Sequence, residues 1–577
     1  MSDAKIVSTQ VTDQERNGID QEIAKFELAI RQLKHRRNNL APISRLPPEI
    51  LGKVFSFIPF GEWDNFSTSA SWIAFSEVSH SWRAVAINTP ELWGELPLGN
   101  VRRARTMLER SKMTDLSINY EFSNIFAPLT SPVVTFLRDV LANHLSHIGE
   151  LRLKRLKPTT FAHLFKDISP SRASKLHTLS ISAGYTLPSI SLSEPQSTLP
   201  DDVFLETERL RHLELSACNI NWDASLLRNL ETLTLSHSHN RPSLKQVLAA
   251  LRQMPGLKSL KMSHSLPKSG DGLVSTKETI SLPRLRMLHL VGTLNEVASV
   301  LVHISIPSTV TLDLGVMEQV TTKDPQLTAL LSSIVAMEKG STRPYRSLTW
   351  KSLTPYQIQF EVYRDKASKY MSNLPDLPTL VLKMGDYSSG SCDALAHRLL
   401  SSLPLQKLES LTYETEGINY GTLARTLGTL PSLHRIRLIG EGMLSMLKAM
   451  FKTTPSQGAD ITLPFPALRK LWIEEARFDD NHPQDSRDAL EMLQDCLIER
   501  CEYGAAIEAI HIDQCYSFDE SSEKALQEIV VDVEWDGFDQ LWEDMDDDDD
   551  EDDDEDDFDF DDDDDYSGGS YPSDYFY

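Results

Sequence analysis

The sequence has little of what marks a secreted or membrane protein. Its five cysteines, in a chain of 577 residues, are few, scattered and odd in number. They do not make a disulfide framework, which is typical of proteins from reducing compartments. Residues 1–18 are polar and lack the apolar core of a signal peptide. No segment approaches the roughly 18 uninterrupted apolar residues of a membrane helix. We therefore expect a soluble protein of the cytoplasm, the nucleus or both, without membrane contact.

Motifs of catalysis and cofactor binding are also missing. The sequence has no GxxxxGK[ST] phosphate loop, no HExxH, no CxxC and no GxSxG nucleophile elbow. Two pairs could ligate a metal, but His237 and His239 have no third ligand beside them, and Cys496 and Cys501 have no second pair. We expect no catalytic residue, no metal site and no cofactor.

Basic charge is scarce, and the acidic excess is concentrated in one segment. The net charge is −27, and residues 543–565 hold 20 acidic residues and no basic ones. The rest of the chain therefore carries −7, the difference between −27 and the −20 of this run. A mildly acidic body does not suit nucleic-acid phosphates, so we expect no direct nucleic-acid binding. Such charge density cannot bury itself, which predicts a disordered acidic tail over residues 534–577.

The acidic tail leaves two interpretations open. It could simply keep the chain soluble. It could also attract basic proteins by long-range electrostatics, which would make this a nuclear acidic scaffold similar to a histone chaperone.

Residues 19–40 have the pattern of an amphipathic helix. Apolar residues follow heptad steps of three and four, with Arg37 at the one seam position that is not apolar: Ile19, Ile23, Phe26, Ile30, Leu33 and Leu40. Three heptads are marginal for an independent coiled coil, so we expect this helix to lie against the next module. The alternative is a homo-oligomer formed through residues 19–40. Residues 1–18 are expected to be disordered.

Residues 41–95 indicate a small helical module. Pro47 and Pro48 set the first turn of a helix, because a missing N–H group costs nothing there. One helix then presents an apolar stripe at Ile50, Leu51, Val54, Phe55 and Ile58, and a second presents Val78, Trp82, Val85 and Ala86. This is more apolar surface than so short a module can bury alone, which indicates a partner.

The same segment resembles the F-box. The stretches Leu-Pro-Pro-Glu-Ile-Leu-Gly-Lys-Val-Phe from Leu46 and Val-Ser-His-Ser-Trp-Arg-Ala-Val-Ala from Val78 are similar to that motif. The continuation Asn-Thr-Pro-Glu-Leu-Trp from Asn88 resembles the end of the motif in the large fungal (basidiomycete-type) family. The loop from Pro59 to Phe75 is longer than is usual there. The resemblance implies a trihelical module that docks the Skp-type adaptor of a cullin–RING ubiquitin ligase. Carried over, the adaptor-binding residues are Leu46, Pro47, Ile50, Leu51, Val54, Phe55, Val78 and Trp82.

One pattern, Leu-x-x-Leu-x-Leu, recurs along residues 96–533. Its last two apolar positions alternate as in a strand with one buried face, which is the pattern of leucine-rich repeats. Copies begin, at irregular spacing, at Ile148, Leu176, Leu210, Leu230, Leu257, Leu285, Leu377, Leu408, Leu433, Leu468 and Ile507, with weaker ones at Met113 and Tyr345.

Together these features predict an α/β protein: an N-terminal helix, an F-box, and an irregular leucine-rich-repeat solenoid with a parallel sheet. The expected function is that of a non-catalytic, substrate-recognition adaptor in an SCF-type ligase. Its F-box would dock the Skp-type adaptor and, through it, cullin, while the repeats would hold an unidentified protein substrate. Such a protein works by proximity, because it raises the local concentration of substrate near the charged enzyme.

Overall fold

The computed structural model describes residues 2–57, 75–123, 128–166, 168, 170–184, 197–268, 279–354, 357–365, 377–385, 392–415, 418–451, 463–479 and 487–538. The predicted long loop before Phe75 and the predicted disorder beyond residue 538 concern residues outside these ranges. The chain divides into two compact units, Met1–Glu409 and Ser410–Tyr577. Within the described ranges, no helix has both the length and the apolar composition that a membrane crossing requires.

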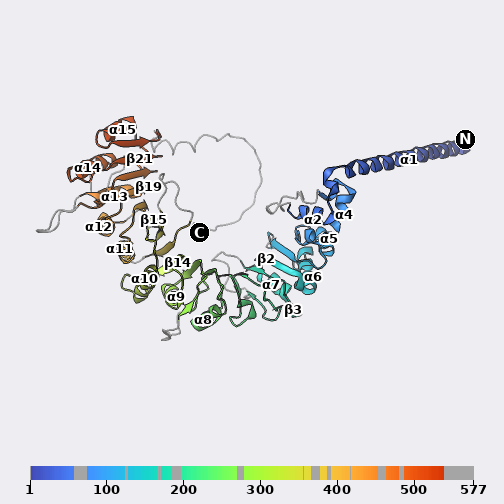
Figure 1. Ribbon diagram of the computed structural model, residues 1–577, viewed down its shortest axis with the longest axis horizontal. Coiled ribbons are helices and arrows are strands. Elements are labelled where there is room, and N and C mark those ends of the chain that lie inside the picture. The colour runs from blue at the N-terminus through green and yellow to red at the C-terminus, as the bar shows by residue number, and fades with distance from the viewer. Residues whose placement is uncertain are drawn as a thin grey trace, which may run out of the picture. The chain divides into compact units, whose positions relative to one another are not determined.

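The N-terminal helix α1 spans Ser2–Asn39 and includes most of the stretch for which we expected disorder. The reason is local: that stretch contains no proline, and its one glycine, Gly18, does not stop the helix. Figure 1 shows α1 as one continuous helix. Every side chain from Glu15 to Arg37 is exposed, and α1 meets the next module near its C-terminal end, where the His35 ring lies 6.4 Å from the His80 ring.

Among the described residues, three short helices and two 3-10 turns follow α1. They are η1 (Pro42–Arg45), α2 (Pro48–Ser56), α3 (Phe75–Val78), α4 (His80–Ile87) and η3 (Pro90–Trp93). The Ser79 hydroxyl caps α4 by accepting the Trp82 N–H at 3.1 Å. Helix α2 approaches the end of α4 closely, because a Cβ at Gly52 would lie 2.7 Å from Thr89 Oγ1. The described part is therefore a trihelical module.

The trihelical module is joined firmly to the first strand of the array. The indole of Trp93 is buried and donates to Ala86 O at 2.8 Å, while the Arg110 guanidinium lies 4.5 Å from the Trp93 ring. Ser117 N–H in turn donates to Gly94 O at 2.8 Å. A side chain at Gly94 would meet Asp115 O at 2.5 Å, so only glycine allows this approach.

The first unit contains a long, mostly parallel sheet. Its strands lie in the order β1-β2-β4-β7-β9-β10-β12-β14-β17-β16-β15. The bounds are β1 Leu116–Glu121, β2 Ile148–Leu156, β4 Thr178–Ala183, β7 His212–Ser216, β9 Thr232–Ser236, β10 Ser259–Ser263, β12 Met287–Gly292, β14 Thr311–Gln319, β15 Ser347–Thr354, β16 Gln357–Tyr363 and β17 Leu380–Gly385. Successive repeats stack in register, so that Leu213 lies beside Leu233, and Leu233 beside Leu260. All three leucines are buried, and they form one continuous core.

Helices return the chain between these strands and lie on one side of the sheet (Figure 1). They are α5 Val101–Ser111, α6 Pro132–His144, α7 Pro158–Phe165, α8 Leu244–Arg252, α9 Leu294–Val302, α10 Pro325–Glu338 and α11 Asp393–Ser402, with 3-10 turns η4 Leu145–His147 and η5 Ser225–Leu227. Two-residue parallel pairs support the turns: β3 Ser171–Arg172 with β6 Phe204–Leu205, β5 Ser197–Thr198 with β8 Cys218–Asn219, and β11 Ile280–Ser281 with β13 Ile304–Ser305.

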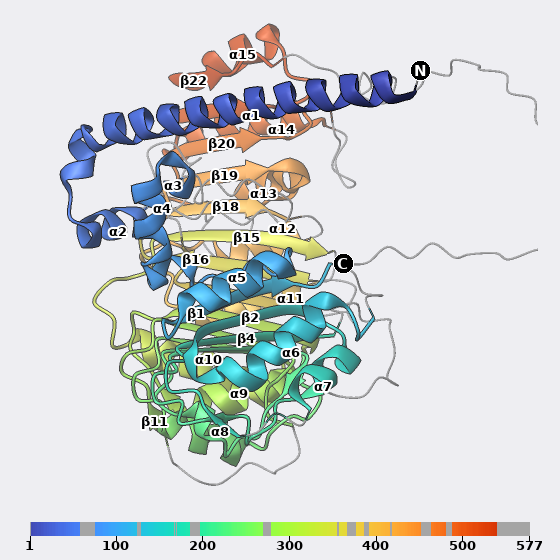
Figure 2. The same ribbon diagram turned by 90° about the vertical axis from the view of Figure 1, so that its right-hand side faces the viewer.

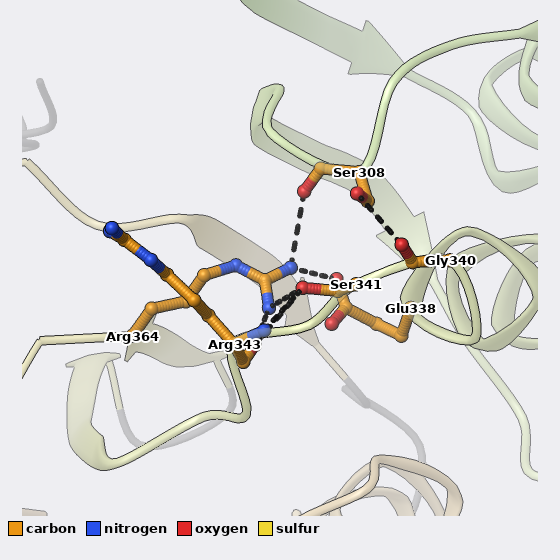
Figure 3. Close-up of polar contacts among 6 residues, drawn as sticks. All are labelled: Ser308, Glu338, Gly340, Ser341, Arg343 and Arg364. Carbon is orange, nitrogen blue, oxygen red and sulfur yellow. Dashed lines mark hydrogen bonds and ion pairs between the residues drawn. The ribbon is translucent and has the colours of Figure 1, made fainter.

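The sheet is mostly parallel, as predicted, and one strand of the first unit is reversed. Strand β16 runs antiparallel to both β15 and β17. Arg364, just after β16, fixes this reversed strand to the end of α10 (Figure 3): its guanidinium donates to Glu338 at 2.6 Å, to Ser341 Oγ at 2.6 Å and to Ser308 O at 3.2 Å. Arg364 and Glu338 are both largely buried, so this ion pair is shielded from water.

The second unit has the same repeating arrangement of strands and helices, with five strands among its described residues. They are β18 Ser410–Glu414, β19 Arg435–Ile439, β20 Lys470–Glu474, β21 Ala509–Asp513 and β22 Asp532–Trp535, and the views place β18, β19 and β20 in chain order (Figure 2). Its helices are α12 Tyr420–Thr426, α13 Met443–Met450, α14 Ala489–Glu502 and α15 Glu520–Gln527, with η6 Gly440–Gly442.

The fold extends beyond the predicted boundary at residue 533. Strand β22 pairs in parallel with β21, and the Trp535 ring packs against Phe518 with centroids 5.6 Å apart. Phe538 packs in the same way against Tyr516, at 5.5 Å. The segment assigned to the start of the tail therefore closes the core of the second unit.

Candidate functional site

Helix α2 carries two neighbouring apolar stripes, one buried and one exposed. Leu51 and Phe55 point inward and are 3% and 1% exposed. Ile50 and Val54 point outward and are 48% and 41% exposed, and Phe57 continues this outer stripe at 76%. Steps of four and three residues keep each stripe on one side of the helix. An exposed apolar stripe of this kind on a small module is typical of a protein-binding surface.

The eight residues predicted to bind the adaptor are thus divided by the structure. Exposed are Leu46, Pro47, Ile50, Val54 and Val78, whereas Leu51 and Phe55 are buried and Trp82 is half-buried. Phe55 and Trp82 contact each other inside the module, with ring centroids 5.1 Å apart. Leu51 and Phe55 therefore have no surface to offer a partner, because α4 occupies the side of α2 that they face.

Two further exposed apolar residues of the F-box segment are absent from the set that we predicted from the sequence. They are Ile43, at 38% exposure, and Phe57. Phe57 follows Ile50 by seven residues, so helical spacing was a sufficient signal for it. Ile43 lies in η1, outside any helical stripe, so helical spacing provided no signal for it. We call the exposed set Ile43, Leu46, Ile50, Val54 and Phe57 the α2 face.

A second candidate surface is the side of the repeat sheet opposite the buried leucines. Its side chains alternate with the leucines along each strand and form hydrogen-bonded chains between strands. Ser263 Oγ lies 3.0 Å from His289 Nε2, and His289 Nδ1 lies 2.8 Å from an Asp313 carboxylate oxygen. The neighbouring imidazole and Lys383 hold the pKa of Asp313 below its ordinary value against the opposing effect of burial.

The order Ser263, His289, Asp313 is that of a nucleophile relay, but its surroundings do not support catalysis. The adjacent His264 N–H, a possible oxyanion donor, is already bound to Val291 O at 2.9 Å, and Ser263 O accepts from His237 N–H. A cavity of about 290 Å³, lined by Trp93 and Arg103 among others, lies in another part of the chain. We interpret the chain of hydrogen bonds as part of a polar recognition surface.

The second unit presents a row of side chains on the same side of its strands. Trp472 on β20 stacks on His511 of β21, with centroids 4.8 Å apart and planes 23° apart. The Arg437 guanidinium on β19 lies 5.9 Å from the Trp472 ring and its Nε donates to Glu474 at 2.7 Å. His511 Nδ1 lies 2.8 Å from Glu534. Stacked aromatic and guanidinium groups of this type are common anchors of protein interfaces.

The titratable groups of the other candidate sites are structural. Cys218, Cys392, Cys496 and Cys515 are buried, and Cys501 is exposed as a free thiol. Burial raises the pKa of the Cys496 thiol to about 12, so it is a poor nucleophile. His237 stacks on His264, with centroids 4.9 Å apart, instead of pairing with His239. Among the residues that the structure describes, no three His, Cys, Asp or Glu side chains gather as metal ligands.

Comparison with known families identifies one domain in this chain. Residues 43–91 match the F-box domain, so the protein contains an F-box domain, and α2, α4 and the α2 face belong to it. Among solved structures, the chain is similar to a leucine-rich-repeat protein of Leptospira interrogans, with 12% identity and a TM-score of 0.23 over 73% of this chain and 100% of that one. No curated protein matches the chain. The fungal subfamily stays a prediction.

Proposed function

We propose that this protein is a substrate-recognition adaptor of an SCF-type cullin–RING ubiquitin ligase, acting in the cytoplasm or the nucleus. The F-box domain docks a Skp-type adaptor, and through it cullin, while the repeat array holds a protein substrate. The observation that carries the proposal is the α2 face, an exposed apolar stripe inside the residues that match the F-box domain. Burying such a stripe against an adaptor removes apolar surface from water.

The protein itself supplies no chemistry in this proposal. It holds the substrate at a high effective concentration near the ubiquitin-charged enzyme. The row of Arg437, Trp472 and His511 and the hydrogen-bonded chain at His289 are the substrate surfaces we favour, because both are partly exposed and held in place by stacking or hydrogen bonds. Side chains that are fixed before binding lose little freedom when a partner arrives.

The docking experiment separates the α2 face from the buried stripe. The full chain with Ile50→Ser and Val54→Ser, co-expressed with a Skp-type adaptor, should bind at least about thirtyfold more weakly, the equivalent of about 2 kcal/mol. Lys53→Ser, on the same exposed helix, is the matched control and should bind like the wild type. Unchanged affinity in the double variant, with thermal unfolding also unchanged, would remove the docking model.

A pull-down from cells distinguishes this function from the scaffold that the acidic run suggests. Recovery of adaptor and cullin, lost in the Ile50→Ser, Val54→Ser variant, supports the ligase role. Recovery of histones or other basic proteins instead, lost in a chain that ends at Phe538 and weakened by salt, supports the scaffold. Ending the chain there keeps β22 and the Phe538 contact with Tyr516.

A further inference from the structure

Helix α1 carries an apolar seam that is open to solvent. The seam consists of residues at heptad spacing: Ile19, Ile23, Phe26, Ile30, Leu33, Arg37 and Leu40. Phe26 is 68% exposed and Leu33 66%, and every seam side chain from Ile19 to Leu33 is exposed in the structure. An isolated helix is only marginally stable in water, and apolar side chains gain by leaving it. The seam therefore needs a partner surface.

The spacing of the seam indicates the kind of partner. Residues at alternating steps of three and four lie along one side of a helix in a left-handed coiled coil. The partner helix must have apolar residues at the same spacing. A second copy of α1 carries it by definition. We propose that α1 pairs with the α1 helix of a second copy, in antiparallel orientation, and that the protein is a dimer through this segment.

The seam residues themselves favour the antiparallel orientation. In that arrangement Ile23 faces Leu33 of the second copy, and Phe26 faces Ile30, so the central layers are entirely apolar. Arg37 then faces Ile19 and can lay its aliphatic stem over it. A parallel pair would instead bring Arg37 against Arg37 of the second copy in one layer, where two like charges meet at the seam.

The charges beside the seam point the same way. The first half of the helix is flanked by Asp20, Glu22 and Glu27, and the second half by Lys34 and Arg36. Antiparallel pairing sets Asp20 opposite Lys34 and Glu22 opposite Arg36, each twice by symmetry. Parallel pairing would set Glu22 opposite Glu27 on both sides, which is repulsive.

One like-charge contact remains in the antiparallel pair, where Glu27 approaches Glu27 of the second copy at the centre. Arg31 lies one turn away on the same helix, and its guanidinium is 3.4 Å from the Glu27 carboxylate. This intrahelical pair offsets part of the repulsion. The balance of charged contacts thus favours the antiparallel dimer.

A charge-reversal experiment tests the pairing. In the full chain, Lys34→Glu with Arg36→Glu should weaken dimerisation by about tenfold or more, measured by sedimentation, because attractive pairs become repulsive. A chain with Asp20→Lys and Glu22→Arg should be weakened likewise, and mixing the two variants should restore a heterodimer. Lys25→Glu, on the helix side away from the seam, makes the same kind of charge change and should dimerise like the wild type. A monomeric wild-type chain, or variants that do not recover on mixing, would overturn the proposal.

Disulfide trapping tests the orientation, in chains that also carry Cys501→Ser to remove the exposed native thiol. A chain with Ile23→Cys mixed with a chain with Leu33→Cys should form a mixed disulfide, because those positions face each other only in the antiparallel pair. Ile23→Cys alone should not cross-link, since ten residues of helix separate the two thiols by about 15 Å. A disulfide formed by Ile23→Cys alone would show a parallel pair and contradict the proposal.

Discussion

The ring of Phe55 lies 5.1 Å from the ring of Trp82 and ties helix α2 to helix α4 inside the F-box domain. Because both Phe55 and Leu51 are buried there, their loss should unfold the domain and not merely weaken docking. We expect Phe55→Ala to destabilise the F-box domain by about 3–5 kcal/mol. Hydrogen exchange of the α4 amides measures this directly, and Val54→Ser, on the outer stripe, should leave their protection unchanged. Equal effects of the two substitutions would contradict the inward and outward assignment.

A charged residue at the position of Leu213 should destabilise the repeat core. It is buried between its neighbours Leu179 and Leu233 in the repeat core. Leu213→Asp would bury an unpaired carboxylate and should lower stability by several kcal/mol, on the order of 4. Because repeats share one core, protection from hydrogen exchange should also fall in β4 and β9. Thr234→Asp, on the partly exposed side of β9, is the control; a loss of the same size there would refute the facing of these strands.

Arg500 is the buried charge that supports the second unit. It is fully buried on α14, and its two terminal nitrogens donate to Pro464 O at 2.9 Å and to Phe465 O at 2.7 Å. Arg500→Met keeps most of the volume but leaves two carbonyls without donors, so we expect a loss of roughly 3 kcal/mol in urea unfolding. Lys470→Met removes an exposed cation of the same unit and should change stability little. If both variants unfold at the same urea concentration, these hydrogen bonds do not stabilise the second unit.

The stacked histidines should make the first unit sensitive to acid. Burial, followed by neighbouring positive charge, lowers the pKa of both His237 and His264 below the ordinary value. The unfolded chain therefore takes up protons first as the pH falls, so stability is full above about pH 6.5 and declines below it. The wild-type melting temperature should drop more between pH 7.5 and pH 5.5 than that of a His237→Asn, His264→Asn variant. Identical drops would exclude this pair as a source of the sensitivity.

Much of the repeat array could be predicted because a strand with one buried face repeats every two residues. Each Leu-x-x-Leu-x-Leu copy, including the weak ones at Met113 and Tyr345, falls on a strand of the structure. The repeat pattern did not predict strand β14, because Thr309 occupies the first apolar position of its copy. Strand β22 was not predicted either, because Trp535 was assigned to an apolar cluster of the tail. Val530 and Val533 nevertheless precede Trp535 at the spacing of the repeat pattern.

Other features lie beyond any local pattern. Periodicity placed Ile50 and Leu51 in one stripe, and only the position of α4 shows which of them is buried. Arg364, just after β16, contacts Glu338 and Ser308, which are 26 and 56 residues away in the chain. The partners of Arg500 lie 36 and 35 residues away. Such distant pairings are decided by packing, and a single sequence does not encode them in its spacing.

The buried Trp93 indole and the hydrogen bond from Ser117 N–H to Gly94 O join the F-box domain directly to β1, without a linker between them. Neighbouring strands of a sheet are about 4.8 Å apart. A substrate held one repeat further along the first unit would therefore be displaced from the ligase by one such step. In the proposed function, the position of the repeat that binds a substrate therefore sets how far the substrate lies from the ligase. That distance selects which substrate lysines the ubiquitin-charged enzyme can reach.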